Sequence, residues 1–153
     1  MGRFNSTPNK EITDTQGNKH WISPSVSTDA LVLVNGFVLI VKRSENMNHA
    51  GKWCLPCGYV EFNENFLDAA YRELFEETGI DIRAFDVINS DYTRPYTLNG
   101  TALQFVFELL NRPDVKLDLK ECTDYAWVST SMLKDYDFAF NHDLLINFLL
   151  SIR

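Results

Sequence analysis

Three glutamates stand at helical spacing in the segment from residue 58 to residue 80, and their carboxylates could hold a divalent cation. They are Glu73, Glu76 and Glu77. Because a helix advances about 100° per residue, all three would fall within an arc of about 100°. Like charges at these spacings repel each other, and a cation bound between them would remove that conflict. The spacing predicts a site for Mg²⁺ or Mn²⁺, since both ions prefer oxygen ligands.

Taken alone, the three glutamates are more typical of a solvated charged face. The order of the surrounding residues decides against that interpretation: Gly58, Glu64, Arg72-Glu73-Leu74, Glu76-Glu77 and Gly79-Ile80. This order resembles the Nudix box at every specified position. The resemblance implies a metal-dependent hydrolase that cleaves a nucleoside diphosphate linked to another moiety and releases a nucleoside monophosphate.

The resemblance also implies roles for individual residues. Glu73, Glu76 and Glu77 match metal ligands of the family, and Glu73 also matches a base that orients water. The backbone carbonyl of Cys57 matches a further ligand. Four residues match the supporting positions, where Arg72 would pair with an acid and fix its rotamer: Gly58, Glu64, Arg72 and Gly79.

An acid outside the box often completes catalysis in this family, on a loop before the strand that carries a tryptophan, here Trp127. Glu121 occupies such a loop and is the candidate. A solvated loop glutamate is the equal alternative.

Substrate choice depends mainly on residues outside the box. Pro95, fifteen positions after Ile80, resembles a marker of the ADP-ribose-cleaving branch, whereas Tyr96 resembles a marker of dinucleoside polyphosphate cleavers. Together with Arg94, they could stack on or hydrogen-bond a ribose or base, which favours ADP-ribose or a nucleotide sugar. A loop breaker beside an exposed aromatic is the structural alternative.

Two further residues are candidates for substrate contact. Arg43 ends a predicted strand and could reach phosphate, or it is a surface charge. Asn141 precedes the last predicted helix and could read a nucleobase edge, or it caps that helix. The cysteines Cys54 and Cys57 form a C-x-x-C, but a structural zinc site needs four ligands and Cys122 is the only other cysteine.

The chain has 153 residues, which is the length of one ordinary domain. Its net charge of −7 disfavours binding to nucleic acid. We expect an arm or edge strand over residues 1–20 and a single domain over residues 21–153. Three cysteines make no disulfide framework, and no apolar stretch is long enough for a membrane span or a signal peptide. We therefore expect a cytoplasmic protein whose partner is a small nucleotide, not a membrane.

The pattern of the chain predicts where the elements lie. Asn35-Gly36 predicts a hairpin between strands at 26–34 and 37–43. Asn65 and Gly79 predict a helix over residues 66–78, packed through Leu67, Ala70 and Leu74. Strands are expected at 59–61, 81–92, 102–110 and 124–128, and helices at 130–136 and 141–152.

These elements predict an α/β fold, an α/β/α sandwich with a mixed β-sheet, which is also the fold that the resemblance implies. Two functions of other classes remain as alternatives. One is a nucleotide-binding sensor without turnover, and the other is an interaction module built on the last helix. The apolar stripe of that helix, predicted at Leu144, Leu145, Phe148 and Leu149, is either core or a homodimer contact.

Overall fold

The centre of the molecule is a hairpin of two apolar strands, β3 (Val26–Val34) and β4 (Phe37–Arg43). The computed structural model describes residues 10–22, 25–85, 87–93 and 101–153. Asn35 and Gly36 both adopt positive φ, 50° and 81°, which is the backbone that a tight two-residue hairpin turn requires. The predicted hairpin is confirmed.

β3 and β4 pair only beside this turn and then diverge. The chain from residue 53 to residue 59 fills the gap, with β5 (Trp53–Cys54) on β4 and β6 (Cys57–Tyr59) on β3. The sequence predicted a strand at 59–61, but the pairing runs through Cys57 and ends at Tyr59. β5 was not predicted, because two residues are too few to show a pattern.

Three more strands complete a mixed sheet of seven. β8 (Thr101–Leu109) runs parallel to β3, β7 (Val87–Thr93) is antiparallel to β8, and β9 (Cys122–Val128) is antiparallel to β4. The strand predicted at 81–92 begins late, because residues Ile82–Ala84 form a short 3-10 helix, η1. The Asp81 carboxylate accepts from the Arg83 N–H and starts this turn in place of a strand.

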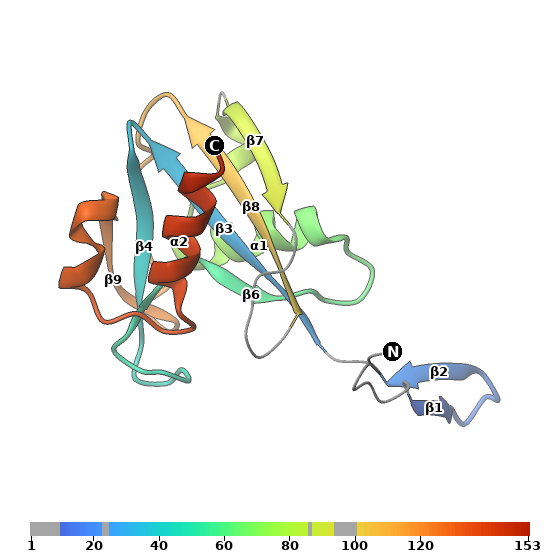
Figure 1. Cartoon of the computed structure of the whole chain (residues 1–153). Helices are drawn as coiled ribbons and strands as arrows, with labels where there is room; N and C mark the ends of the chain where they lie inside the picture. The colour runs from blue at the N-terminus through green and yellow to red at the C-terminus, as the bar shows by residue number, and fades with distance from the viewer. Residues whose placement is uncertain (1–9, 23–24, 86, 94–100) are drawn as a thin grey trace, which may run out of the picture.

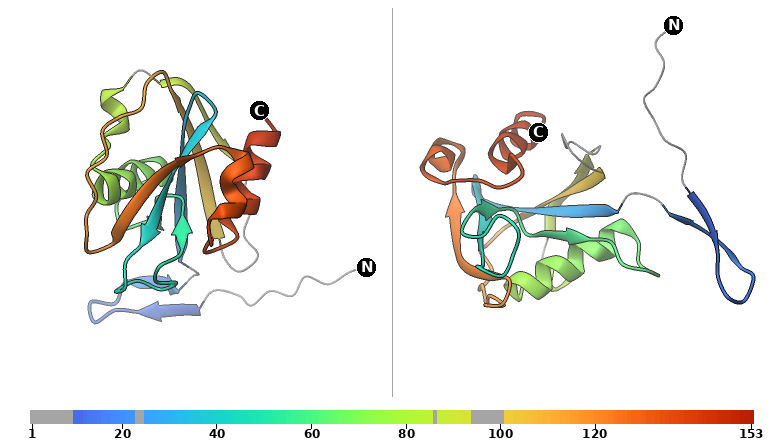
Figure 2. Two further views of the ribbon diagram at one scale, coloured as in Figure 1. Left: turned by 90° about the vertical axis from the view of Figure 1, so that its left-hand side faces the viewer. Right: turned by 90° about the horizontal axis from the view of Figure 1, so that it is seen from below.

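Helices cover both faces of the sheet (Figures 1 and 2). α1 (Phe66–Thr78) packs Ala70 and Leu74 on one face against β3 and β8. α2 (His142–Ser151) and the 3-10 helix η2 (Thr130–Asp135) pack on the other. Each face therefore has its own apolar cluster, and the predicted α/β/α sandwich with a mixed sheet is confirmed.

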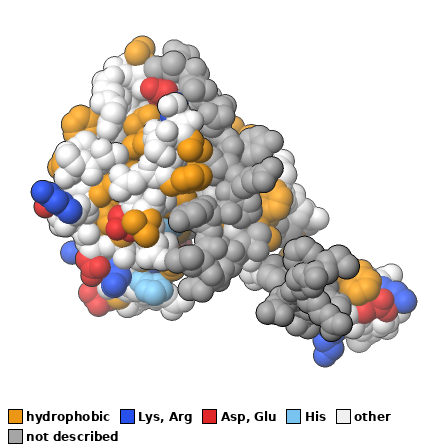
Figure 3. All heavy atoms as spheres, in the orientation of Figure 1, with side chains coloured by type: hydrophobic (Ala, Val, Ile, Leu, Met, Phe, Trp, Pro, Cys, Tyr) orange, Lys and Arg blue, Asp and Glu red, His pale blue; other side chains and the backbone are white. Residues whose placement is uncertain are grey.

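The apolar stripes of both helices differ from the predicted ones. In α2 the buried apolar residues are Leu145, Ile146 and Leu149, whereas Leu144 and Phe148 of the predicted stripe are 53% and 39% exposed. Hydrophobic side chains accordingly reach the surface over α2 (Figure 3). In α1, Leu67 lies in the first turn, beyond the edge of the sheet cluster, and is 37% exposed.

Near the N-terminus, β1 (Lys10–Thr13) and β2 (Lys19–Ile22) pair with each other in a separate two-stranded sheet. The Asp14 carboxylate accepts from the backbone N–H groups of Gln16 and Asn18 and so closes the turn between them. The described residues of the predicted arm thus form a two-stranded sheet outside the main one. No helix in the described part of the chain is long and apolar enough to cross a membrane.

Candidate metal centre

α1 carries Glu73, Glu76 and Glu77, and the caps at its two ends define where the helix begins and ends. The Asn65 side chain accepts from the Asp68 N–H at 2.8 Å at the start. At the end, Gly79 adopts a left-handed conformation, with φ 72°, and its N–H donates to Phe75. Both ends lie where the sequence predicted them, because the two cap residues carry a strong local signal.

Three carboxylates converge beside the sheet: Glu73, Glu77 and Glu121. One oxygen from each lies within 4.8 Å of the others. Glu77 is 3% exposed, and the side chain of Glu73 is 12% exposed. Glu73 and Glu77 are four residues apart, so they stand one above the other on the side of α1 that faces the sheet.

Glu76 is not a member of this cluster, although the sequence placed it with Glu73 and Glu77. Its side chain is 49% exposed and accepts from Arg72 at 3.0 Å. Glu76 lies at the outer margin of the predicted arc, where α1 turns toward solvent. The three glutamates do share one arc of the helix, but only the part with Glu73 and Glu77 faces the sheet.

Arg72 holds the neighbouring acids in place. Its guanidinium donates to both oxygens of Glu64, at 2.7 and 3.0 Å, and to Oε1 of Glu73 at 2.8 Å. It also donates to the Tyr59 carbonyl, which ties α1 to the end of β6. These bonds lower the pKa of Glu64 and raise that of Arg72. Arg72 therefore fixes the rotamer of Glu73 and leaves Oε2 of that residue open.

Gly58 allows Glu73 to approach β6. A Cβ atom on residue 58 would lie 2.1 Å from the carboxyl carbon of Glu73, far inside van der Waals contact. The φ angle of Gly58 is not positive, so glycine is needed here because of the space that Glu73 occupies.

The backbone of Cys57 also faces the cluster. Its N–H donates to Oε2 of Glu77 at 3.3 Å. In the antiparallel pair of β3 and β6, Cys57 stands opposite Asp29, while the neighbouring Pro56 carbonyl bonds Ala30. Because N–H and C=O of one strand residue point to the same edge, the Cys57 carbonyl is directed away from β3, to the edge at which its N–H meets Glu77.

Glu121 reaches the cluster on a turn before β9 that is tied down at several points. Its carbonyl accepts from the Ser44 N–H at 2.8 Å, and its N–H donates to the Asp118 carbonyl. The Asp118 N–H in turn donates to the carbonyl of Glu77. The turn is therefore attached to α1 itself, which places Glu121 opposite Glu77.

The cluster is electrostatically unfavourable without a cation. Burial is the largest cause that raises the pKa of Glu77 well above its ordinary value, followed by nearby negative groups that include Glu73 and Glu121. Burial also raises the pKa of Glu73, although Arg72 opposes the shift. A divalent cation would reverse both effects.

The residues present fit a hard divalent ion. Three carboxylate oxygens and a directed backbone carbonyl form an all-oxygen donor set, which Mg²⁺ and Mn²⁺ prefer over softer ligands. Cys54, Cys57 and Cys122 are free thiols. Among the described residues, this acidic group is the one in which several ligand atoms converge, so the C-x-x-C gives no zinc site there.

The other candidate residues are not members of this cluster or lie outside the described residues. Arg43 borders the cluster, because its guanidinium lies 3.8 Å from the Cys54 sulfur and its charge interacts with that of Glu77. Arg43 is 8% exposed; its Nε donates to the Asn48 carbonyl and its guanidinium lies 4.9 Å from the Phe140 ring. It is thus no surface charge. Asn141 is exposed at the N-cap of α2, without a side-chain capping bond. Arg94, Pro95 and Tyr96 lie outside the described residues.

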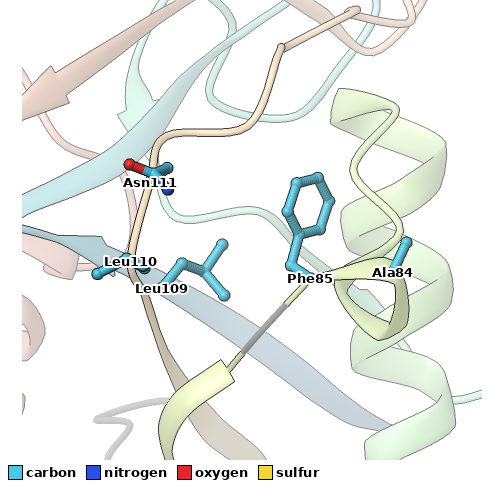
Figure 4. A pocket seen from close by; sticks show the side chains of 5 residues that line it. All are labelled: Ala84, Phe85, Leu109, Leu110 and Asn111. Carbon is cyan, nitrogen blue, oxygen red and sulfur yellow. The ribbon is translucent and has the colours of Figure 1, made fainter.

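A small pocket opens elsewhere, between η1 and the end of β8, with a volume of about 210 Å³. Figure 4 shows the side chains that line it: Ala84, Phe85, Leu109, Leu110 and Asn111. None of them belongs to the acidic cluster, and none of them carries a positive charge that would attract a phosphate.

Comparison with known proteins agrees with the geometry. The family model of the NUDIX domain matches residues 24–148. This chain belongs to the Nudix hydrolase family. The Nudix domain is 26% identical over 134 residues to an ADP-ribose pyrophosphatase of Methanocaldococcus jannaschii, with 80% of this chain and 79% of that protein covered.

Two longer proteins are also similar to this Nudix chain. A bifunctional NMN adenylyltransferase/ADP ribose pyrophosphatase of Francisella tularensis, solved with AMP and a Mn ion, is 27% identical with a TM-score of 0.65, over 84% of this chain. An ADPR responsive transcriptional repressor of Acinetobacter baylyi is 29% identical over 71% of this chain. The chain spans less than half of each, 42% and 44% respectively.

Several residues that shape the centre of this Nudix domain carry little signal in the sequence. Ser44 and Asp118 hold the turn that carries Glu121 through backbone bonds and through their side chains, which both bond the backbone of Lys120, and Tyr59 contributes only its carbonyl. His142 and Asp29, which are buried beneath the β5–β6 turn, looked like an ordinary helix start and a polar residue in an apolar strand. A buried aspartate in a strand was the one signal that could have pointed there.

Proposed function

We propose that this protein is a divalent-metal-dependent hydrolase that cleaves the pyrophosphate link of ADP-ribose or a nucleotide sugar and releases a nucleoside monophosphate. The convergence of Glu73, Glu77 and Glu121 beside the Cys57 carbonyl carries the proposal. The names of the archaeal and Francisella relatives support ADP-ribose as the first substrate to test.

Glu73, Glu77, Glu121 and the Cys57 carbonyl would hold the cation, which we propose to be Mg²⁺ or Mn²⁺. When bound, such an ion neutralises charge on phosphate oxygens and lowers the pKa of water. Glu76 serves instead as a partner that holds Arg72. The choice between the two ions is decided by titrating each into the metal-free protein.

The reaction needs a positioned water and a base for its proton. Arg72 occupies Oε1 of Glu73 and leaves Oε2 to orient the water and accept its proton. The water oxygen bonds to one phosphorus as the bond from that phosphorus to the bridging oxygen breaks. One product is a nucleoside monophosphate, and the other keeps the second phosphate.

A panel of nucleotides tests both the reaction and its substrate. Purified protein is incubated with Mg²⁺ or Mn²⁺ and ADP-ribose, nucleotide sugars, diadenosine polyphosphates or nucleoside triphosphates, and monophosphate release is measured. We expect the highest kcat/KM for ADP-ribose or a nucleotide sugar. No monophosphate from any compound would overturn the hydrolase, and preference for a diadenosine polyphosphate would overturn the substrate.

The similarity to an ADPR responsive repressor favours one second candidate, a sensor that binds the nucleotide without turnover. Both functions predict binding of ADP-ribose, but only the hydrolase predicts a product. Calorimetric binding followed by product analysis of the same sample separates them.

Cytoplasmic residence and a homodimer stay predictions. Light scattering on the purified protein tests the homodimer.

A further inference from the structure

A buried histidine lies beneath the loop that carries the metal-facing carbonyl. His142 is the first residue of α2 and is 4% exposed. Its Nδ1 accepts from the Leu55 N–H at 3.0 Å. Because Nδ1 accepts a backbone hydrogen bond, the ring proton sits on Nε2, which lies 3.7 Å from Oδ1 of Asp29.

The ring is held in this orientation from both sides. Oδ2 of Asp29 accepts from the Gln104 side chain at 3.0 Å, so β3 and β8 fix the carboxylate that faces Nε2. On the other side, the chain enters α2 through Phe140 and Asn141, whose φ values of 59° and 55° are uncommon for residues other than glycine. Strained backbone of this kind is retained where a neighbouring side chain must be aimed.

The Leu55 N–H belongs to the turn that joins β5 to β6. Leu55 is fully buried, so water cannot replace the imidazole if the bond is lost. The next residue, Pro56, gives its carbonyl to Ala30 of β3 at 2.8 Å. Cys57 follows, with its N–H on Glu77. The bond from His142 therefore fixes the chain two residues before the candidate metal ligand.

We propose that His142 is a positioning residue for the metal centre, which it supports from the opposite face of the sheet by holding the Leu55 N–H. The inference rests on the proposed function, because it takes the Cys57 carbonyl as a ligand. His142 touches neither metal nor substrate; it sets the place of the Cys57 backbone. Burial lowers the pKa of His142, which keeps Nδ1 free to accept at neutral pH.

Two amide substitutions separate this role from simple packing. In His142→Asn the amide oxygen can lie where Nδ1 lies and accept from Leu55. In His142→Gln the amide reaches the place of Nε2 and offers nothing to Leu55. Both variants are polar and uncharged. His142→Asn keeps the bond from Leu55 and gives up the contact with Asp29, and His142→Gln does the reverse. Leu149→Val, in the same helix and buried in the apolar cluster that includes Leu55, controls for loss of stability.

The first measurement is Mn²⁺ affinity, from the electron paramagnetic resonance signal of free Mn²⁺. We expect His142→Gln to bind Mn²⁺ about tenfold or more weakly, as is typical when a supporting partner of a metal ligand is lost. His142→Asn and Leu149→Val should stay within about threefold of the wild type on the same scale. Saturating Mn²⁺ should restore most of the turnover of His142→Gln.

The second measurement needs no metal. Hydrogen exchange of the Cys57 amide in metal-free protein should be faster in His142→Gln than in His142→Asn. Equal exchange and equal Mn²⁺ affinity in these two variants would overturn the inference and leave the proposed function intact. A wild-type protein that binds no Mn²⁺ would overturn the proposed function, and the inference with it.

Discussion

At the scale of single residues, the structure divides three glutamates that the sequence grouped together. Glu73 and Glu77 face the sheet and meet Glu121, whereas Glu76 faces solvent and binds Arg72. A wheel shows which residues share an arc, but it does not show which margin of that arc the sheet covers. The sequence therefore identified the acidic helix and grouped all three of its glutamates, of which Glu73 and Glu77 converge with Glu121 in the structure.

Exchange of Glu77 or Glu76 for glutamine distinguishes the two positions. In the wild type, Glu77 is a buried ligand that stabilises the transition state by several kcal/mol through the metal. Glu77→Gln removes this ligand, so kcat should fall about a thousandfold. Glu76→Gln removes an exposed partner of Arg72 and should change kcat by less than about tenfold, the effect of a weak surface ion pair. Steady-state kinetics at saturating Mn²⁺ measures both. Equal losses in the two variants would contradict the cluster described above.

Gly58→Ala tests the close approach between β6 and Glu73. The new Cβ would lie 2.1 Å from the carboxyl carbon of Glu73, so the carboxylate must move. We expect Mn²⁺ affinity to fall about tenfold or more, and the free energy of unfolding to fall by about 1–3 kcal/mol. Calorimetric titration and urea unfolding provide the two values. Unchanged Mn²⁺ affinity would mean that Glu73 adjusts without cost.

At the scale of elements, the sequence predicted those helix ends and turns that depend on a few adjacent residues. Asn65 and Gly79 define α1 because capping depends on a few adjacent residues, and Asn35-Gly36 defines the hairpin for the same reason. β5 and η1 were missed, since their form depends on pairing with β4 and on one Asp81 bond. Glu121 stayed ambiguous because its turn is placed by bonds to Ser44, far away in the sequence, and to Asp118, and these bonds leave no periodic pattern.

Asn65→Ala should weaken α1 without changing its path. Loss of the bond from the Asp68 N–H to Asn65 should lower the free energy of unfolding by about 1 kcal/mol. Asn147→Ala, at an exposed position inside α2, is the matched control and should change it by less than about 0.5 kcal/mol. Chemical unfolding of the metal-free protein measures both. A similar loss in the two variants would show that the cap has no special role.

At the scale of the whole molecule, stability and metal binding are linked through pH. The pKa values of Glu73 and Glu77 are raised in the folded protein above those of the unfolded chain. Groups of this kind contribute stability below their unfolded pKa, and that contribution is lost as pH rises through the folded value. The metal-free protein therefore carries an increasing penalty toward neutral pH, which a cation removes.

The rise in Tm that Mn²⁺ produces should consequently be larger at pH 7.5 than at pH 5.5. Binding should also release protons, most of all at the lower pH, because the ligands must be ionised. Thermal unfolding with and without Mn²⁺ at each pH tests the first expectation, and calorimetry in two buffers tests the second. Glu77→Gln should flatten the dependence. A Tm increment that is the same at both pH values would argue against buried carboxylate ligands.

The divergence of β3 from β4 has a mechanical consequence. The segment from β5 to β6 fills the gap between the two strands. It is hydrogen-bonded to β4 at one end and to β3 at the other, and both strands belong to the central sheet. This segment cannot swing outward as a lid does, because any displacement would break its hydrogen bonds to β3 or β4. The turn that carries Glu121 is likewise bonded to Ser44 and, through Asp118, to Glu77, so we expect the metal ligands to move little during turnover.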